Sequence, residues 1–158
     1  MAFADTLADL KTQVGTEVHT SDWLEISQEM INAFGRATFD MQWIHTDPER
    51  AATESPYGIT IAHGYFTLSL YPQLRGMVDE SKPVFPGAAR VINYGLNKLR
   101  FPAAVPAGSR IRAHCELLSA EEVKGSIEIV EKYSVEVEGQ ERPACIAEAI
   151  MRLYFQDA

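Results

Sequence analysis

Two side chains in this sequence have the types and spacing for proton-transfer chemistry. They are Asp40 and His45, five positions apart in the run FDMQWIHTDPERAA. A carboxylate beside an imidazole can hold one water molecule, because the carboxylate accepts a proton while the imidazole orients the water or shuttles a proton near neutral pH. The spacing alone is more typical of a solvated carboxylate and a surface histidine, since a catalytic assignment depends on geometry.

A second candidate feature is the dipeptide His63-Gly64, near the start of a long apolar segment. Glycine lets a ligand approach the backbone closely, and the unbonded N–H groups at a helix start favour negative charge. An oxyanion that forms on a carbonyl oxygen would be stabilised there. Considered alone, Gly64 is more readily explained as a position that admits a close-packed strand.

Two helices are expected on either side of the carboxylate and the imidazole. Ser27 has the side chain of a helix N-cap, and the apolar spacing of three and four that follows it predicts a helix ending near 38–39. The run DPERAA at 47–52 predicts a short helix with proline in its first position. Asp40 and His45 are therefore expected in a loop between two helical segments.

Residues 59–78 predict a long central helix. The segment carries apolar side chains on all sides, and a helix that is apolar all round is buried all round. Pro72 removes one backbone hydrogen bond and is expected to bend this helix. Such a helix needs an enclosing layer.

After residue 90 the apolar residues recur with a period of two, which predicts strands with one buried face. Gly95 marks an expected bulge or close approach. The class is therefore α+β, with a curved antiparallel sheet wrapped around the central helix. The strands are expected at 90–101, 111–117, 127–137 and 145–155, with turns at 119–125 and 138–143.

Length and charge limit the remaining possibilities. A chain of 158 residues predicts one domain, 1–158. Lys and Arg number 14 against 22 Asp and Glu, a formal charge of −8, and the absence of a basic run argues against a nucleic-acid partner. No apolar stretch reaches about 18 residues, so no membrane span is expected.

Location and metal content are also expectations from the sequence. The start MAFADTLADLKTQ lacks the cationic and apolar regions of a signal peptide, and two cysteines fit a reducing compartment, so we expect a cytoplasmic protein. The histidines other than His45 are scattered in the sequence, without ligand spacing, and we therefore expect no metal site. They are His19, His63 and His114.

The two motifs, taken together and in order, resemble a known family. The run from Asp40 to Ala51, followed by Ile61-Ala62-His63-Gly64, is similar to the hydratase motif of MaoC-like dehydratases, which are (R)-specific enoyl-CoA hydratases with a single hot-dog domain. The stretch 93–102 is similar to a segment of the NodN-like branch. The resemblance covers nearly the whole chain and implies a long central helix wrapped by a curved antiparallel sheet.

The resemblance also implies roles for individual residues. The family's catalytic Asp and His fall on Asp40 and His45, and its oxyanion-hole glycine falls on Gly64. The implied reaction adds water to a trans-2-enoyl-CoA to give an (R)-3-hydroxyacyl-CoA, without a metal or redox cofactor. The remaining residues expected to bind substrate are Gln42, His63 and Tyr65, with Lys98 and Arg100 for the coenzyme A phosphates.

A second copy of the chain is the expected partner. Hot-dog domains resemble one another in pairing as homodimers with their sheets side by side. A strand-rich half with an open sheet edge is an independent reason to expect such a partner, because an unpaired edge exposes hydrogen-bonding groups.

Departures from the family pattern keep two other functions open. This chain has Phe39 where the family commonly has Gly, and Gln42-Trp43 where it commonly has Asn-Pro. A hydroxyl that some members use falls on Pro72, so no role is assigned there. The alternatives are a hot-dog acyl-CoA thioesterase and a non-catalytic acyl-CoA-binding or partner subunit; the spacing of Asp40 and His45 favours hydration.

Overall fold

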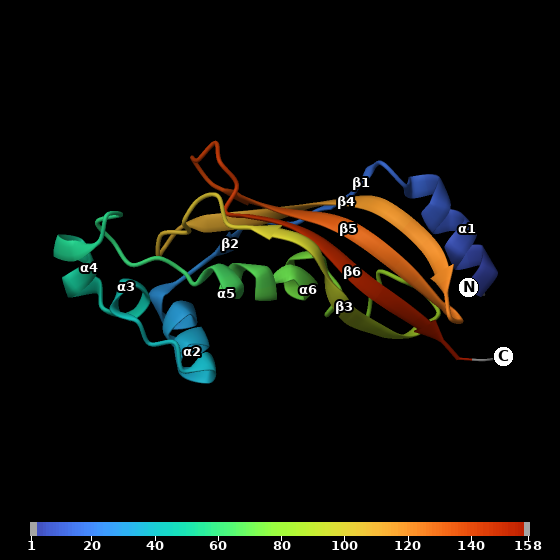
Figure 1. Ribbon diagram of the computed structural model, residues 1–158, viewed down its shortest axis with the longest axis horizontal. Helices are drawn as coiled ribbons and strands as arrows, with labels where there is room; N and C mark the ends of the chain where they lie inside the picture. The colour runs from blue at the N-terminus through green and yellow to red at the C-terminus, as the bar shows by residue number, and fades with distance from the viewer. Residues whose placement is uncertain (1–2, 157–158) are drawn as a thin grey trace.

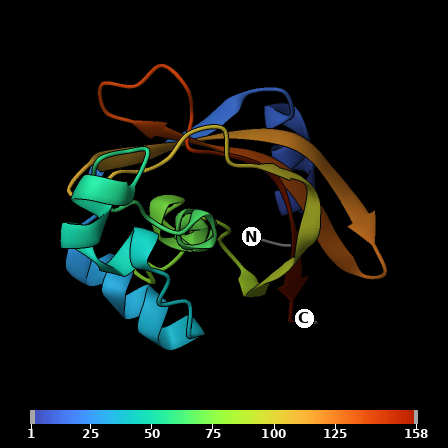
Figure 2. The ribbon, with the colours of Figure 1, turned by 60° about the vertical axis from the view of Figure 1, so that its left-hand side comes forward.

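An antiparallel sheet arches over two short helices in this computed structural model, which describes residues 3–156 (Figure 1). The sheet order is β1-β4-β5-β6-β3, with β2 also beside β4. Figure 2 looks nearly along the central helices and shows the strands curving over them. The α+β prediction is therefore confirmed. The strands are β1 (Glu17–Thr20), β2 (Leu24–Glu25), β3 (Ala88–Arg100), β4 (Arg110–Val123), β5 (Ser126–Val137) and β6 (Cys145–Phe155).

The helices before the central segment form largely as expected. In α2 the Met30 N–H donates to the Ser27 side chain, which confirms the predicted N-cap. The Asp47 carboxylate caps the start of α4, where proline occupies the first turn. These helices are α1 (Phe3–Gln13), α2 (Gln28–Thr38), α3 (Trp43–Thr46) and α4 (Pro48–Glu54).

The loop predicted for Asp40 and His45 was wrong in one respect. Asp40 lies in the connection after α2, but His45 belongs to the short helix α3. Its N–H and that of Thr46 donate to the Gln42 carbonyl and close one helical turn. This helical turn could not be predicted from the sequence, because four residues are too few for an apolar period to be recognised.

The central helix is shorter than predicted and divided in two. It consists of α5 (Gly64–Ser69) and α6 (Tyr71–Leu74), joined at Leu70. Pro72 explains the division, because it lacks the N–H that would continue the helix. Residues 60–62 are extended instead of helical, because Ala62 N–H donates to the Val105 carbonyl and Ala107 N–H donates to the Thr60 carbonyl.

The expectation that this helix is buried on all sides was also wrong. One face of α5 is open in the protomer, where the Tyr65 side chain is 67% exposed. The opposite face packs under the sheet, where Phe66 and Thr67 are buried. The helix is therefore a half-buried element with an apolar outer face.

The strands alternate as predicted, with the core on the concave side of β4, β5 and β6. The turn expected at 119–125 is only two residues long. Lys124 and Gly125 both have positive φ, the conformation of a tight hairpin. The turn was predicted too long because the last residues of β4 include polar side chains. The register of β3 shifts beside Gly95, as expected for a bulge. No helix among residues 3–156 is long and apolar enough to cross a membrane.

A buried ion pair fastens α6 to the sheet. The Arg75 guanidinium donates to both carboxylate oxygens of Glu131 on β5, at 2.9–3.1 Å, and the two side chains are 7% and 1% exposed. The Tyr71 hydroxyl donates to the same carboxylate at 2.5 Å. Burial and the Glu131 charge raise the pKa of Tyr71, so this hydroxyl keeps its proton and serves as a donor.

Candidate active site

The Asp40 carboxylate lies just beyond the end of α2. Phe39, which precedes it, has a φ of 62° in the left-handed region, the conformation that glycine adopts most easily. The Gln42 side-chain amide donates to Asp40 Oδ1 at 2.8 Å, and this hydrogen bond is the main reason that the pKa of Asp40 is lowered. The Asp40 side chain is 37% exposed, so an ionised carboxylate is reachable from solvent.

The His45 imidazole is held in one orientation. Its Nδ1 lies 2.7 Å from the Ile61 carbonyl oxygen, and because a carbonyl can only accept, Nδ1 carries the proton. The Nε2 atom is then the basic nitrogen. Burial lowers the pKa of His45, which favours the neutral ring. The Gln28 amide fixes the backbone by donating to the His45 carbonyl at 2.7 Å.

His63 lies against both of these residues. Its ring stacks on that of His45 with centroids 3.9 Å apart and planes 27° apart, and its Nε2–H donates to the Asp40 backbone carbonyl at 2.9 Å. One carboxylate oxygen of Asp40 and one ring nitrogen from each histidine lie within 4.8 Å of one another. The structure thus brings Asp40 and His45 together as predicted.

The expectation that the histidines are scattered was wrong, because His63 and His45 are neighbours. The cluster has the residue types of a metal site, but its geometry does not suit one. A metal ion must lie in the plane of each imidazole that binds it, about 2.0–2.1 Å from the nitrogen. The two imidazole rings are stacked, so the planes that contain their nitrogen lone pairs lie one above the other, 27° apart. A single ion cannot lie in both planes at a metal–nitrogen distance. The arrangement suits a water molecule better.

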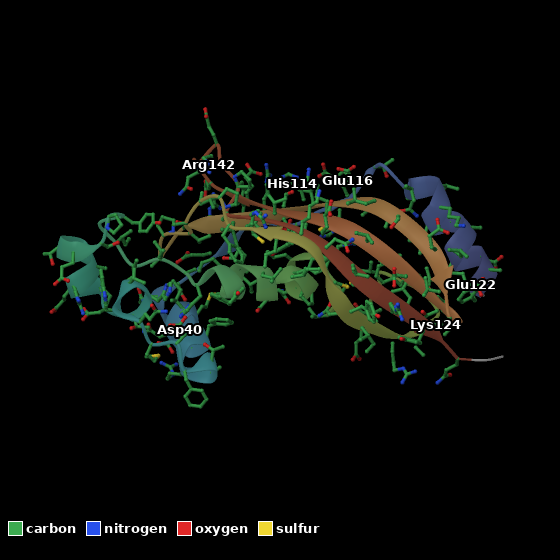
Figure 3. The ribbon with its side chains drawn as sticks, viewed as in Figure 1. Asp40, His114, Glu116, Glu122, Lys124 and Arg142 are labelled. Carbon is green, nitrogen blue, oxygen red and sulfur yellow. The ribbon has the colours of Figure 1, made fainter. Side chains whose placement is uncertain are left out.

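Gly64 begins α5, at the end of the helix that faces the α2–α3 side of the molecule, where Asp40 also lies (Figures 1 and 3). Among the described residues, neither the Gly64 N–H nor the Tyr65 N–H has a hydrogen-bond acceptor. A Cβ at position 64 would lie 2.8–3.0 Å from the Phe101 ring. The close-packing explanation of this glycine is therefore valid, and it does not exclude a role for the N–H.

A cleft of about 570 Å³ opens beside Gly64, between α5, the 101–106 segment and the loop after β5, and most of the residues that line it are apolar. Asp40 and His45 do not line it, but His45 is linked to it through Ile61, which lines the cleft and accepts a hydrogen bond from the His45 ring. Arg142 is the one cation among its lining residues. Figure 3 shows Arg142 on the loop above the sheet and Asp40 below it, at the same end of the molecule.

An apolar groove of about 430 Å³ lies on the other side of the central helices, between α5, α6 and β3. Leu68 and Ser69 of α5 line one wall, and Tyr94 and Leu96 of β3 line the other. The groove follows the exposed face of α5 that begins at Tyr65. The groove therefore lies beside the helix that starts at Gly64.

Other predicted substrate-binding residues lie outside these hollows. Tyr65 is exposed and packs edge-on against Phe101, with ring centroids 5.9 Å apart. Lys98 and Arg100 lie on the exposed edge strand β3 and line neither hollow. Their roles stay predictions.

Three residues of the site were not predicted. Gln28 orders the His45 backbone, Gly35 admits the Asp40 carbonyl, and Arg142 lines the cleft beside Gly64. Only Gly35 carried a sequence signal, because a glycine inside a predicted helix costs stability unless something packs closely against it.

The chain is similar to known proteins over most of its length. The MaoC-like domain family matches residues 9–139. The 3-hydroxyacyl-thioester dehydratase Z of Mycobacterium tuberculosis is 49% identical over 149 residues, which is 94% of this chain and 95% of that protein. Nodulation protein N of Rhizobium leguminosarum bv. viciae is 41% identical over 152 residues, covering 95% and 92% of the two chains.

Solved structures support the fold. An R-hydratase from Pseudomonas aeruginosa, in its unliganded form, aligns with a TM-score of 0.69 and 22% identity over 90% of this chain and 83% of that one. This likeness and the sheet arching over α5 and α6 confirm the predicted hot-dog fold. With the family match over most of its length, the chain belongs to the MaoC-like dehydratases, a family of hydro-lyases.

Proposed function

We propose that this protein adds water to a trans-2-enoyl-CoA and forms an (R)-3-hydroxyacyl-CoA. The observation that carries the proposal is the meeting of the Asp40 carboxylate with the His45 imidazole within 4.8 Å. A water molecule makes hydrogen bonds of about 2.8 Å, so it can bridge two groups at that separation. Asp40 is ionised and His45 Nε2 is basic, so both groups accept hydrogen bonds from the same water.

The reaction proceeds by general base catalysis. Asp40 takes a proton from the water while the oxygen of that water bonds to the β-carbon of the enoyl group. The electrons of the double bond move toward the thioester oxygen, which becomes an enolate stabilised by the Gly64 N–H. The α-carbon then takes a proton from the same pair. One water is added in total, and Asp40 ends the cycle ionised.

The two hollows beside α5 match the two ends of the proposed substrate. The cleft beside Gly64 suits the phosphate-bearing coenzyme A through Arg142, because guanidinium groups bind phosphate with two parallel hydrogen bonds. The apolar groove along Leu68 and Leu96 suits an acyl chain. Both hollows flank the helix that begins at Gly64, where the thioester carbonyl is proposed to bind. The relative from Mycobacterium is itself named as a dehydratase of 3-hydroxyacyl thioesters.

We further propose that the working form is a homodimer joined through β3. This strand has 13 residues and lies at one edge of the sheet, with Val91, Ile92 and Tyr94 exposed. A long, apolar, unpaired edge favours pairing with another strand. A second copy would also cover the apolar groove. Sedimentation equilibrium should report twice the 17.6 kDa chain mass, and a monomer at micromolar concentration would contradict the proposal.

Crotonyl-CoA tests the reaction directly and separates the alternatives. Loss of the enoyl absorbance without release of free thiol is the expected result, and chiral chromatography should identify the (R) product. Release of thiol would instead indicate a thioesterase. Tight binding with no change in either signal would indicate a non-catalytic subunit. Either of these two outcomes would overturn the proposed function.

A further inference from the structure

His63 is buried behind the reactive pair. Its side chain is 3% exposed, and its Nδ1 atom is fully buried with no hydrogen-bond partner among the described residues. Its other nitrogen is occupied by the Asp40 carbonyl. No polar atom of this ring is therefore available to a substrate, which argues against the substrate-binding role predicted from the sequence.

One side chain nevertheless contacts both members of the pair. The face of the His63 ring lies on the His45 ring, and its edge donates to the Asp40 backbone. We infer that His63 is a positioning residue that sets the separation and orientation of Asp40 and His45. The inference rests on the proposed hydration reaction. Reacting groups displaced by about 1 Å can cost about 10²-fold in rate, so such a role has a measurable effect.

Helix α2 closes the other side of the Asp40 backbone. A Cβ at Gly35 would lie 2.9 Å from the Asp40 carbonyl oxygen, 3.0 Å from the Met41 sulfur and 3.6 Å from His63 Cε1. The Asp40 carbonyl is therefore confined between Gly35 and His63. Because this carbonyl is confined, the His63 hydrogen bond helps to hold the Asp40 backbone, and with it the carboxylate of the same residue, in place.

Histidine combines two properties that this position requires. It offers a flat ring to stack on His45 and an N–H at the ring edge, and two simple substitutes each keep only one of these. Phenylalanine keeps the ring and loses the donor, whereas glutamine keeps a donor and loses the ring. Phe34 packs on the same ring with centroids 5.0 Å apart and fixes its tilt. The two contributions can therefore be separated by two substitutions.

The test compares His63→Phe and His63→Gln with the wild type. Both variants should lower kcat for crotonyl-CoA by about 10²-fold with little change in KM, because the pair is misaligned and the substrate contacts remain. His19→Gln is the matched control, since the His19 ring also bonds a backbone carbonyl, that of Leu74, outside the site. This control should keep the wild-type kcat.

Nitrogen NMR of the His45 ring gives a readout that needs no activity. His63→Gln uncovers one face of that ring and removes the His63 charge, so the pKa of His45 should rise toward its ordinary value; His63→Phe removes the charge but keeps the face covered, so the pKa should rise less. A raised KM with unchanged kcat would make His63 a substrate-binding residue and overturn the inference. An unchanged kcat and an unchanged His45 titration in both variants would also overturn it. If the wild type fails to hydrate crotonyl-CoA, the proposed function fails, and the titration still decides the positioning role.

Discussion

His45 Nδ1 donates a hydrogen bond to the Ile61 carbonyl oxygen over 2.7 Å, and this contact determines which ring nitrogen is basic. The proton on Nδ1 leaves the lone pair on Nε2. Since Asp40 is also an acceptor, the site holds two bases and is built to take a proton from water. The contact further links the imidazole to the segment that leads into Gly64, so His45 and the Gly64 N–H are held by the same stretch of backbone.

The rate should fall with acidity only below the ordinary imidazole pKa. Burial lowers the pKa of His45 from 6.5, so the neutral ring persists as the pH falls through that value. Protonation below the lowered pKa removes the acceptor on Nε2. A plot of kcat/KM for crotonyl-CoA against pH should therefore stay flat down to below 6.5 and then decline. A decline that begins above 6.5 would show that the ring is not buried in the working enzyme.

Removing either base should abolish most of the hydration. Asp40→Asn and His45→Gln each delete one proton acceptor, and general acid–base assistance contributes about 10²–10⁴ in rate. Both side chains are partly exposed, so the fold should persist, as circular dichroism melting would show. Glu49→Gln on the exposed face of α4 is the matched control for loss of a carboxylate. Near-wild-type turnover in either site variant would reject the assignment of the pair.

Local signals predicted much of the scaffold. The cap at Ser27 and the spacing of three and four located α2, and hence the place where Asp40 emerges. Alternation with a period of two located the long strands. These features were predictable because each depends on neighbours in the sequence. The short helix α3 was missed because one turn leaves no recognisable period.

Contacts between distant segments could not be predicted in the same way. The extended backbone before Gly64 forms because Ala62 pairs with Val105, 43 positions later, and no local pattern encodes that pairing. The approach of Arg142 to the cleft depends on the path of the loop after β5. The position of His63 behind His45 likewise follows from the packing of α2 and α5, and the sequence shows only a histidine before a glycine.

The Gly64 N–H can be tested apart from the packing of Phe101. On a Phe101→Ala background, which makes room for a side chain, Gly64→Ala should keep the N–H and most of the activity, whereas Gly64→Pro removes it. Proline fits the first helical position, and His63 has the extended backbone that precedes proline. The proline variant should be about 10²–10³-fold slower in kcat than the alanine variant. Equal rates would show that the Gly64 N–H does not stabilise the enolate.

Arg142 should matter for the coenzyme A portion of the substrate and for nothing else. Arg142→Gln removes the one cation that lines the cleft beside Gly64. It should raise KM for crotonyl-CoA and leave KM for crotonyl-pantetheine unchanged, because pantetheine lacks the nucleotide phosphates. Steady-state kinetics with the two thioesters measures the difference, and Arg36→Gln on α2 is a control that lies outside the cleft. Equal effects on both thioesters would remove the phosphate-binding role.

The pair Arg75 and Glu131 should contribute to stability through its partnership rather than through each charge separately. Glu131→Gln leaves a buried guanidinium without a counter-charge, which costs about 3–5 kcal/mol in the free energy of unfolding. Adding Arg75→Met removes that charge and leaves the Gln oxygen to accept from Tyr71, so the double variant should recover most of the loss. Urea unfolding measures both. If the double variant loses as much free energy of unfolding as the two single variants lose together, the Arg75 charge is not what destabilises Glu131→Gln.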